Sequence, residues 1–379
     1  MSSDGDSPTI SYRTATLSDY DAVMSIGGIY GGRDYLWSLY RQLVMDPDKH
    51  GIVALDGETV VGFYMTSTFD GGRTVLKRSG RVREDYRGRG IFHALEAELD
   101  KHTLKHRPRA MYDVFANTEK EEHLADKFLD MGFKEVCRKD MYHMLLNSSR
   151  LFKPTDNAPN KPISVMELTK EDLKLLFSAG DISRQLFPAQ RLLNTYMPYR
   201  LLESNIQYMI CERGGAFVSL EDPDVADKQS NGRIELPHSR PPQQEISTNN
   251  RNEDLDLHLS NNTMHGSLDA ASVKNVAMVS FFYCYPTPDG FLYYLDPYAR
   301  KGLPSAHFRA HFDKNMETLQ RYFPNQNGIL TVTHDSNIAA DEIISCLDDY
   351  GIVKQMEGQE KTQILYERDR AMYGFHVEN

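Results

Sequence analysis

Hydrophobic and polar positions recur with two different periods over the first 146 residues of the chain. Alternation at every second residue predicts β-strands at 10–15, 50–54, 59–68, 74–82, 111–116 and 133–146. Apolar residues at helical spacing predict helices at 17–26, 35–44, 92–106 and 120–131. Gly57 suits a hairpin turn, and Gly132 directly follows the last of these helices. The pattern therefore predicts a mixed α/β domain over residues 10–146.

Part of this pattern returns in the second half of the chain. One segment matches the strand and helix start at 10–20, and three others repeat the strand, helix and strand of 111–146. The repeated segments are 162–173, 328–333, 338–350 and 352–366. A repeat of this length indicates a duplicated domain rather than a solenoid. The expected fold class is therefore α/β, with two tandem mixed sheets.

Two segments lack the pattern. Residues 1–9 are acidic and polar, and residues 221–274 are rich in Asn, Ser, Asp, Gln and Pro and poor in aromatic residues. Such segments cannot bury enough apolar surface to become ordered. We therefore expect a disordered N-terminus and a disordered insert within a second domain at 162–370. A linker with two prolines, 147–161, joins the two domains.

Charge and composition narrow the class of protein. The 379 residues carry a formal net charge of −11, which argues against a general nucleic-acid binder. No run of about 18 apolar residues occurs, and the N-terminus has no apolar signal core, so we expect no membrane segment. The four cysteines are far apart and the histidines form no zinc motif. We therefore expect reduced thiols, no metal site and a cytoplasmic location.

The segment 81–92, RVREDYRGRGIF, predicts a strand that runs through a glycine loop directly into a helix. The free N–H groups and the dipole at a helix N-terminus favour an anion. Gly88 and Gly90 let the backbone approach a phosphate closely, and Arg87 and Arg89 add forked donors. The alternative is an exposed strand face with solvated arginines, but glycines beside the charges favour a pyrophosphate site. The matching place in the second copy, 296–304, has one glycine, so we expect no clear glycine loop there.

These residues resemble motif A of the GCN5-related N-acetyltransferase (GNAT) superfamily, written R/Q-x-x-G-x-G/A. Arg87 and Gly90 fall on its marked positions, and Phe92 replaces the small residue at the third. Asn117 and the stretch 128–134, FLDMGFK, are similar to later signals of the superfamily. The resemblance covers residues 10–146.

The resemblance implies that acetyl-CoA is the co-substrate and that an amine attacks its thioester directly. The pantetheine arm would lie beside the strand at 81–83, and the backbone N–H of Val82 would act as the oxyanion donor. The residues implied in cofactor binding are Val82, Arg83, Arg87, Gly88, Arg89, Gly90, Ile91 and Asn117.

A narrower similarity extends over both halves. The segments 27–36, 46–48, 198–200 and 203–205 resemble the animal histidine N-acetyltransferase group. This implies a small-molecule amine as the partner, with the α-amine of histidine as the leading candidate. One alternative is a protein lysine or N-terminal acetyltransferase, which needs an open groove for a peptide. Another is a non-catalytic CoA-binding or interaction module, because 75–80 contains no carboxylate and Phe128 stands where many members of the superfamily have a proton-donating Tyr.

The acceptor site is expected between the first two helices, as the resemblance implies. Arg33 suits a substrate carboxylate, and Asp34 suits an amine or an imidazole. Glu203 is a candidate base through water, and Tyr35 is a further catalytic candidate. The residues expected to bind the acceptor are Tyr30, Arg33, Asp34, Tyr35 and Tyr199. The alternative is that the glycine-rich stretch 27–32 is only a tight turn and that Tyr35 is a core residue.

Overall fold

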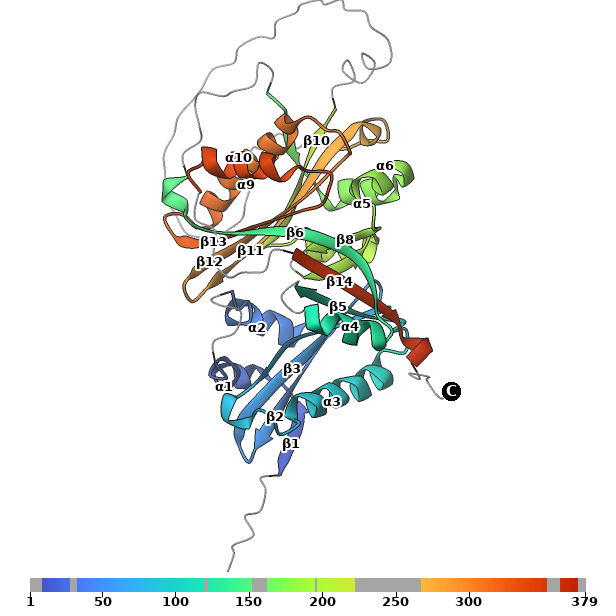
Figure 1. The fold of residues 1–379 in the computed structure, drawn as a ribbon, viewed down its shortest axis with the longest axis vertical. Coiled ribbons are helices and arrows are strands. Elements are labelled where there is room, and N and C mark those ends of the chain that lie inside the picture. Colours follow the sequence, from blue (N-terminus) through green and yellow to red (C-terminus); the bar gives the residue numbers. More distant parts are fainter. Residues whose placement is uncertain are drawn as a thin grey trace, which may run out of the picture.

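A computed structural model describes residues 9–27, 33–118, 122–151, 162–194, 196–221, 267–352 and 362–373 (Figure 1). The expected disordered N-terminus, up to residue 8, lies outside these residues, as does most of the expected insert, 222–266. Tyr30 also lies outside them.

The first half contains the elements that the hydrophobic pattern predicts, in the predicted order. They are β1 (Ile10–Thr14), α1 (Tyr20–Met24), α2 (Leu36–Met45), β2 (Lys49–Asp56), β3 (Thr59–Phe69), β4 (Thr74–Val82), α3 (Ile91–His106), β5 (Tyr112–Thr118), α4 (Glu122–Asp130) and β6 (Lys134–Asn147). Strands β1 to β4 are antiparallel neighbours, and β5 is parallel to β4. The α3 helix buries Ile91, Leu95 and Leu99, which lie four residues apart and therefore share one face.

The second half has more elements than its sequence pattern indicates. They are β7 (Val165–Glu167), α5 (Lys170–Ser178), α6 (Gly180–Leu186), β8 (Arg191–Asn194), β9 (Met197–Arg200), α7 (Ile206–Met209), β10 (Gly214–Leu220), β11 (Val276–Thr287), β12 (Gly290–Ala299), α9 (Ser305–Tyr322), β13 (Asn327–His334), α10 (Ala340–Asp349) and β14 (Thr362–Asp369). The last strand was expected from residue 352, but the structure describes it only from Thr362 onward.

The duplication is visible in how the first helical turn of each half begins. Thr16 and Asp19 form a capping box at the start of the first half, and Thr169 and Asp172 form one at the start of α5. In each box the threonine and the acidic residue satisfy each other's backbone N–H groups, which otherwise have no helical partner. The same T-x-x-D spacing therefore performs the same task in both halves.

Twelve of the described strands form one sheet, in which the two halves exchange their last strands, and β8 and β9 form a separate two-stranded sheet. The strand order is β1-β2-β3-β4-β5-β14-β6-β13-β12-β11-β10-β7. Strand β14, from the end of the chain, pairs antiparallel with β5, and β6, from the first half, pairs antiparallel with β13. In Figure 1 these two strands cross the middle of the molecule. Each half therefore completes the sheet of the other. A division of the chain at the expected linker, 147–161, does not account for this exchange.

Side chains from both halves also share a core. The α2 residues Leu36 and Leu39 belong to the same buried cluster as Tyr285 and Leu292 of β11 and β12. The expected insert 221–274 is shorter at its C-terminal end than the sequence indicated, because Leu268 and Val273 are buried in another shared cluster.

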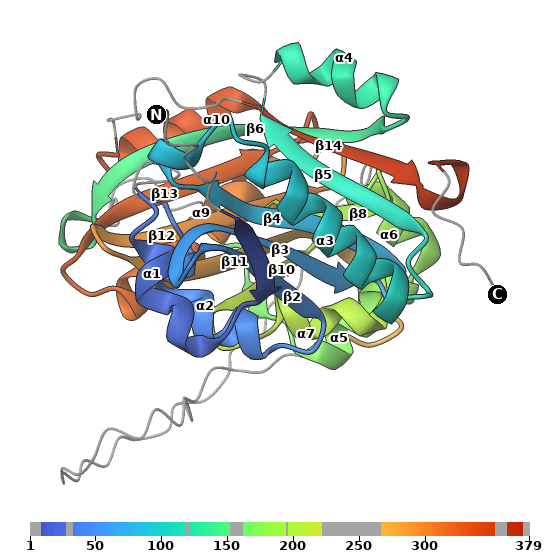
Figure 2. The ribbon, with the colours of Figure 1, turned by 90° about the horizontal axis from the view of Figure 1, so that it is seen from below.

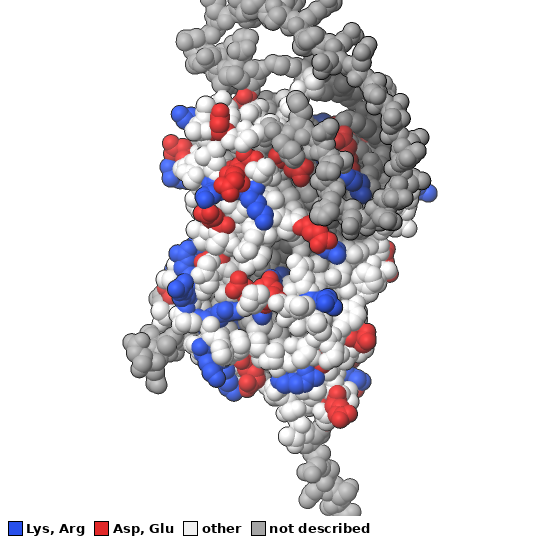
Figure 3. Space-filling model, turned by 180° about the vertical axis from the view of Figure 1, so that it is seen from behind, with Lys and Arg blue, Asp and Glu red and all other residues white. Residues whose placement is uncertain are grey.

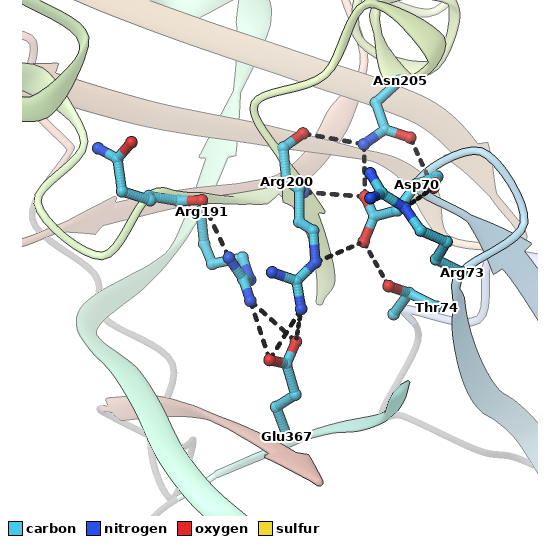
Figure 4. A network of polar contacts seen from close by, with 8 residues as sticks. Asp70, Arg73, Thr74, Arg191, Arg200, Asn205 and Glu367 are labelled. Carbon is cyan, nitrogen blue, oxygen red and sulfur yellow. Dashed lines mark hydrogen bonds and ion pairs between the residues drawn. The ribbon is translucent and has the colours of Figure 1, made fainter. Parts of the chain in front are cut away.

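A polar network ties the exchanged strand β14 to both halves (Figure 4). Glu367 of β14 accepts hydrogen bonds from Arg191 at 2.9 Å and from Arg200 at 2.8 and 2.9 Å. Asp70, in the turn after β3, accepts the backbone N–H of Arg200 at 3.0 Å and the side-chain amide of Asn205 at 2.6 Å. These bonds attach the β8–β9 hairpin of the second half to the turn after β3 and to β14.

Candidate functional site

A cavity opens where the parallel strands β4 and β5 separate. These strands pair at three positions, which end at Leu76 and Val114. Beyond this point residues 77–80 and 115–117 line opposite sides of a cavity of about 520 Å³. The second half closes it with aromatic and apolar side chains, which include Tyr196, Met197, Tyr199, Tyr208, Tyr283, Tyr285 and Tyr294. The cavity is therefore built by both halves.

A bulge in β4 turns its backbone toward this cavity. Phe63 of β3 pairs with Arg81 and Met65 pairs with Arg78, so Ser79 and Gly80 together oppose Tyr64 alone. Ser79 has φ +63°, an unusual value for a residue with a side chain. A Cβ at Gly80 would lie 2.5 Å from a ring carbon of Phe92, so a larger residue there would require the Phe92 ring to move. Sequence reasoning did not find this bulge.

The glycine loop before α3 has the geometry that the sequence predicts. Gly88 and Gly90 have φ of +76° and +78°, and Gly90 is the residue that begins α3. No side chain caps this helix, and no atom would lie within 4 Å of a Cβ at either glycine. Arg87 and Arg89 are exposed beside them. The loop therefore offers open space, helix N–H groups and positive charge to an anion. Figure 2 shows α3 lying across β2 and β3.

The expected cofactor residues on the strands fall into two places. Asn117 is buried and lines the cavity at β5. Val82 pairs with Gly62 in the ladder and does not line the cavity, and its carbonyl accepts a hydrogen bond from Arg87 at 3.3 Å. Arg83, at the end of the strand, donates its backbone N–H to Val61 at 2.9 Å. The backbone nearest to the cavity is that of Ser79 and Gly80.

Tyr35 lies at the centre of a polar cluster in the cavity. Its hydroxyl forms a short hydrogen bond with the hydroxyl of Ser79 and accepts one from Nε of Arg78 at 2.9 Å. The guanidinium of Arg78 also lies 4.3 Å from the centre of the Tyr35 ring. Tyr35 is therefore a cavity residue with a polarised hydroxyl, and not only a core residue. Neither Arg78 nor Ser79 was among the site residues expected from the sequence.

Arg33 and Asp34 are neighbours in the sequence but have different surroundings. Arg33 lines the cavity and lies 3.3 Å from Nε2 of His143, which comes from the exchanged strand β6. Asp34 does not line it. Its carboxylate pairs with the buried Arg81 at 2.9 and 3.2 Å and accepts the backbone N–H of Leu36 at 3.1 Å. The structure thus gives Asp34 an ion pair in place of the expected amine contact.

Tyr199 and Glu203, the two site residues expected from the second half, also have different surroundings. Tyr199 is buried in the cavity wall, stacked on Tyr208 with ring centres 5.7 Å apart. Burial raises its pKa well above the ordinary value, because the phenolate would lose its water. Glu203 is 68% exposed, pairs with Lys174 at 2.7 Å and does not line the cavity. The expected role of Glu203 as a base therefore has no geometric support.

The cavity wall is cationic and rich in tyrosine. Its charged residues among the described part of the chain are Arg33, Lys49, Lys77 and Arg78, with no Asp, Glu or His. Lys49 is paired with Asp46, and Lys77 lies 3.0 Å from Glu96 and 2.8 Å from Asp100. The wall therefore has an excess of positive charge, which suits an anionic ligand rather than a cationic one.

Comparisons with known proteins agree with this geometry. Residues 20–133 match the model of the acetyltransferase (GNAT) family. A tandem GNAT protein from the clavulanic acid biosynthesis pathway has a similar structure, with a TM-score of 0.52 and 12% identity, over 95% of this chain and 98% of that one. This similarity confirms the predicted tandem fold.

Two curated proteins are similar in sequence. A histidine N-acetyltransferase from Xenopus tropicalis is 29% identical over 198 residues, which cover 50% of this chain and 60% of that protein. A probable N-acetyltransferase 16 from Homo sapiens is 23% identical over 211 residues, which cover 53% and 56%. The similarity therefore spans less than two thirds of either relative.

The corresponding opening in the second GNAT-like copy is filled by a buried ion pair. Strands β12 and β13 pair up to Leu295 and Val332. Next to this point Asp296 forms short contacts with Lys139 and Thr333 and accepts the hydroxyl hydrogen bond of Tyr298 at 2.8 Å. Burial is the main cause that raises the pKa of Asp296, and Lys139 opposes this rise. Lys139 comes from the exchanged strand β6, so the exchange itself seals the second opening.

Within the described residues, no group of three His, Cys, Asp or Glu side chains could hold a metal ion. No helix in the same residues is long and apolar enough to cross a membrane.

Proposed function

We propose that this chain is an acetyl-CoA-dependent N-acetyltransferase that acetylates the α-amine of a free amino acid, with histidine as the leading candidate. The observation that carries the proposal is the cavity between β4 and β5, which is closed by tyrosines, contains two arginines and lies beside a glycine loop open to a pyrophosphate. The name of the Xenopus tropicalis relative supports histidine.

The residues present fit acetyl-CoA as the first substrate. Gly88, Gly90 and the start of α3 would hold the pyrophosphate, with Arg87 and Arg89 beside it. The pantetheine arm would follow β4 past Val82 and Arg83 toward Asn117. The thioester carbonyl would then accept a backbone N–H of β4, from Val82 or from the bulge at Ser79 and Gly80, which faces the cavity.

The acceptor would enter the same cavity from the side of α2. Its amine attacks the thioester carbon, the new N–C bond forms, and the C–S bond breaks. The nitrogen gives up a proton and the thiolate takes one. The hydroxyl of Tyr35, hydrogen-bonded to Arg78 and Ser79, is the group in the wall that we assign to this transfer. Tyr35 would thus supply the proton that a Tyr supplies at the position of Phe128 in many members of the superfamily. Phe128 itself packs among Phe115, Phe133 and Tyr366 and has no proton to give.

The same wall disfavours the alternative of a protein lysine acetyltransferase. A lysine side chain would bring a cation next to Arg33 and Arg78, and a peptide would have to pass the side chains of the second half that close the cavity. The absence of a carboxylate from the wall still leaves a reason to consider the non-catalytic CoA-binding module. Turnover distinguishes the two possibilities.

The test is an assay of thiol release with the purified full-length chain and acetyl-CoA. The acceptors are the twenty amino acids, histamine and a lysine-containing peptide, and mass spectrometry identifies the product. We expect release with histidine and a product acetylated on its α-nitrogen. No release above background with any free amino acid would contradict the proposal. Binding of acetyl-CoA without turnover of any amine would instead favour the non-catalytic module.

A further inference from the structure

Among the described residues, no counter-ion balances the charge of Arg78 in the cavity. Its Nε donates to the hydroxyl of Tyr35 at 2.9 Å, and Nη1 lies 2.9 Å from the sulfur of Met197. A thioether is a weak acceptor, and a neutral phenol does not balance a charge. No described carboxylate forms an ion pair with this guanidinium, and Arg78 lines the cavity.

Other arginines with little exposed side chain in the same molecule are paired with a carboxylate. Arg81 is paired with Asp34, with 1% of its side chain exposed. Arg191 lies 2.9 Å from Glu367, and Arg370 is paired with Asp113. Removing a charge from water is costly unless an opposite charge compensates for it. The exception at Arg78 therefore indicates that a ligand brings the anion.

The position of Arg78 separates this anion from the pyrophosphate. Arg78 precedes the bulge, whereas the glycine loop begins beyond Val82, four residues further along β4. At 3.3 Å per residue the strand alone spans about 13 Å. The side chain of Arg78 instead contacts Tyr35 of the α2 side and Met197 of the second half, which is where the acceptor would lie.

We propose that Arg78 binds the α-carboxylate of the acceptor and so makes the enzyme selective for free amino acids over the corresponding decarboxylated amines. This inference rests on the proposed function. The α-amine is two bonds from the carboxylate carbon, so a carboxylate held at Arg78 brings the amine next to the bulge at Ser79 and Gly80. Arg33, on the same wall, is the second cation available to the carboxylate.

Histidine and histamine test this directly because they differ by the carboxylate. For Arg78→Gln we expect the ratio of kcat/KM for histidine to kcat/KM for histamine to fall about 100-fold, the effect of losing the cationic partner of the carboxylate, because the lost hydrogen bond to Tyr35 affects both acceptors and cancels in the ratio. Arg78→Lys should keep part of the preference for histidine, since it keeps the charge. The exposed Arg184→Gln, on α6, serves as the matched control and should leave both values unchanged.

Calorimetry separates this inference from the proposed function. Acetyl-CoA should bind Arg78→Gln as it binds the unaltered chain, which also shows that the variant is folded. In the presence of CoA, histidine should bind the unaltered chain more tightly than histamine, and Arg78→Gln should lose that difference. If the unaltered chain shows this preference without turnover, the catalytic proposal fails and the role of Arg78 stands. Equal losses for histidine and histamine, or weaker acetyl-CoA binding, would overturn the role of Arg78.

Discussion

The hydroxyl of Tyr35 occupies a place in the cavity that its hydrogen bonds make suitable for proton transfer. It contacts Ser79 and accepts from Arg78 at 2.9 Å, and no cavity carboxylate among the described residues competes for the role. Tyr35→Phe keeps the ring over which the guanidinium lies and removes only the hydroxyl. We expect kcat to fall by about 10²- to 10⁴-fold with a smaller change in KM for histidine, because general acid–base catalysis contributes an effect of this size.

Steady-state kinetics with histidine and acetyl-CoA measure this effect. Tyr20→Phe is a suitable control, since the Tyr20 hydroxyl also makes one hydrogen bond, to the backbone of Trp37 at 2.9 Å, away from the cavity. A kcat for Tyr35→Phe within threefold of the unaltered chain would show that another group carries the proton.

Gly90 combines a left-handed backbone with the start of α3. Its φ of +78° and its open surroundings are matched by Gly302 before α9, with φ +79°. Valine at either position should cost a similar ~1–2 kcal/mol of stability, because its side chain crowds the backbone at positive φ. Only Gly90→Val should weaken acetyl-CoA binding, by about tenfold or more, since only this loop is expected to hold the pyrophosphate.

Titration calorimetry with acetyl-CoA compares the two glycine variants. Gly302→Val controls for backbone strain and for general loss of stability. Equal affinities for acetyl-CoA in the two variants would place the pyrophosphate elsewhere in the chain.

At the scale of residues, Arg78 is a site residue that could not be predicted from the sequence. The glycine loop could be predicted because its chemistry lies within one short segment. The acceptor wall could be predicted only in part: Tyr35 and Tyr199 were expected there, but Arg78 was not, because the three residues come from three elements and meet only in the folded chain. Asp34 was expected to bind the acceptor and Glu203 to act as a base, and in the structure each is paired with a nearby cation, Arg81 or Lys174.

At the scale of elements, the exchange of β6 and β14 had no signal in the sequence. Alternation predicted a strand at the end of each half, but it does not say which sheet the strand completes. The two strands follow similar helices and have similar partners, β5 and β13, so either pairing satisfies the same pattern. What distinguishes the exchanged arrangement is long-range contact, for example Lys139 of β6 with Asp296 of β12.

The pair of Lys139 and Asp296 should be important for stability. Only 4% and 2% of the two side chains are exposed. Lys139→Met would leave Asp296 buried without its cation, and we expect the free energy of unfolding to fall by about 3–5 kcal/mol. The neighbouring Arg138 pairs with Glu135 on the surface, with both side chains more than 40% exposed. Arg138→Met should therefore cost no more than about 1 kcal/mol.

Urea denaturation of the two variants at pH 7 measures this difference. It is informative because the two positions are adjacent on β6 and differ mainly in burial. A loss below about 1 kcal/mol for Lys139→Met would mean that the second opening does not depend on this ion pair.

At the scale of the whole molecule, the net charge of −11 does not reflect the charge of the cavity. Acidic and basic side chains are interspersed over the face seen in Figure 3. Neither sign forms a single patch on that face, while the cavity wall has four cationic residues. Composition could therefore argue against a general nucleic-acid binder, but it could not indicate that the ligand site favours anions.

A buried chain of hydrogen bonds should make the stability of the whole molecule depend on pH. Along α9, His311 lies 3.0 Å from the Ser219 hydroxyl and 2.7 Å from that of Ser280, and Ser219 also contacts His307 at 2.9 Å. Burial lowers the pKa of His311 to about 3, since an imidazolium there would lose its water, and the nearby His307 adds to this. His311 is thus neutral in the folded protein at pH 5 to 7.

Stability falls with falling pH because the pKa of His311 is lower in the folded chain than in the unfolded chain. The unfolded imidazole binds a proton below its ordinary pKa of 6.5, whereas the folded one does not until about pH 3. The contribution of His311 is therefore complete above pH 6.5 and is lost as the pH falls toward 3. Between pH 7 and pH 5 we expect the free energy of unfolding to fall by about 2 kcal/mol from this residue alone.

Denaturation at several pH values tests this in the unaltered chain and in His311→Gln, which keeps a polar side chain but does not titrate. The pKa of His102 is also lowered, to about 4, mainly by burial, so some fall with the same sign should remain in the variant. His93→Gln is the control, because 81% of the His93 side chain is exposed. If His311→Gln loses as much stability between pH 7 and pH 5 as the unaltered chain, His311 is not the residue that couples the fold to pH.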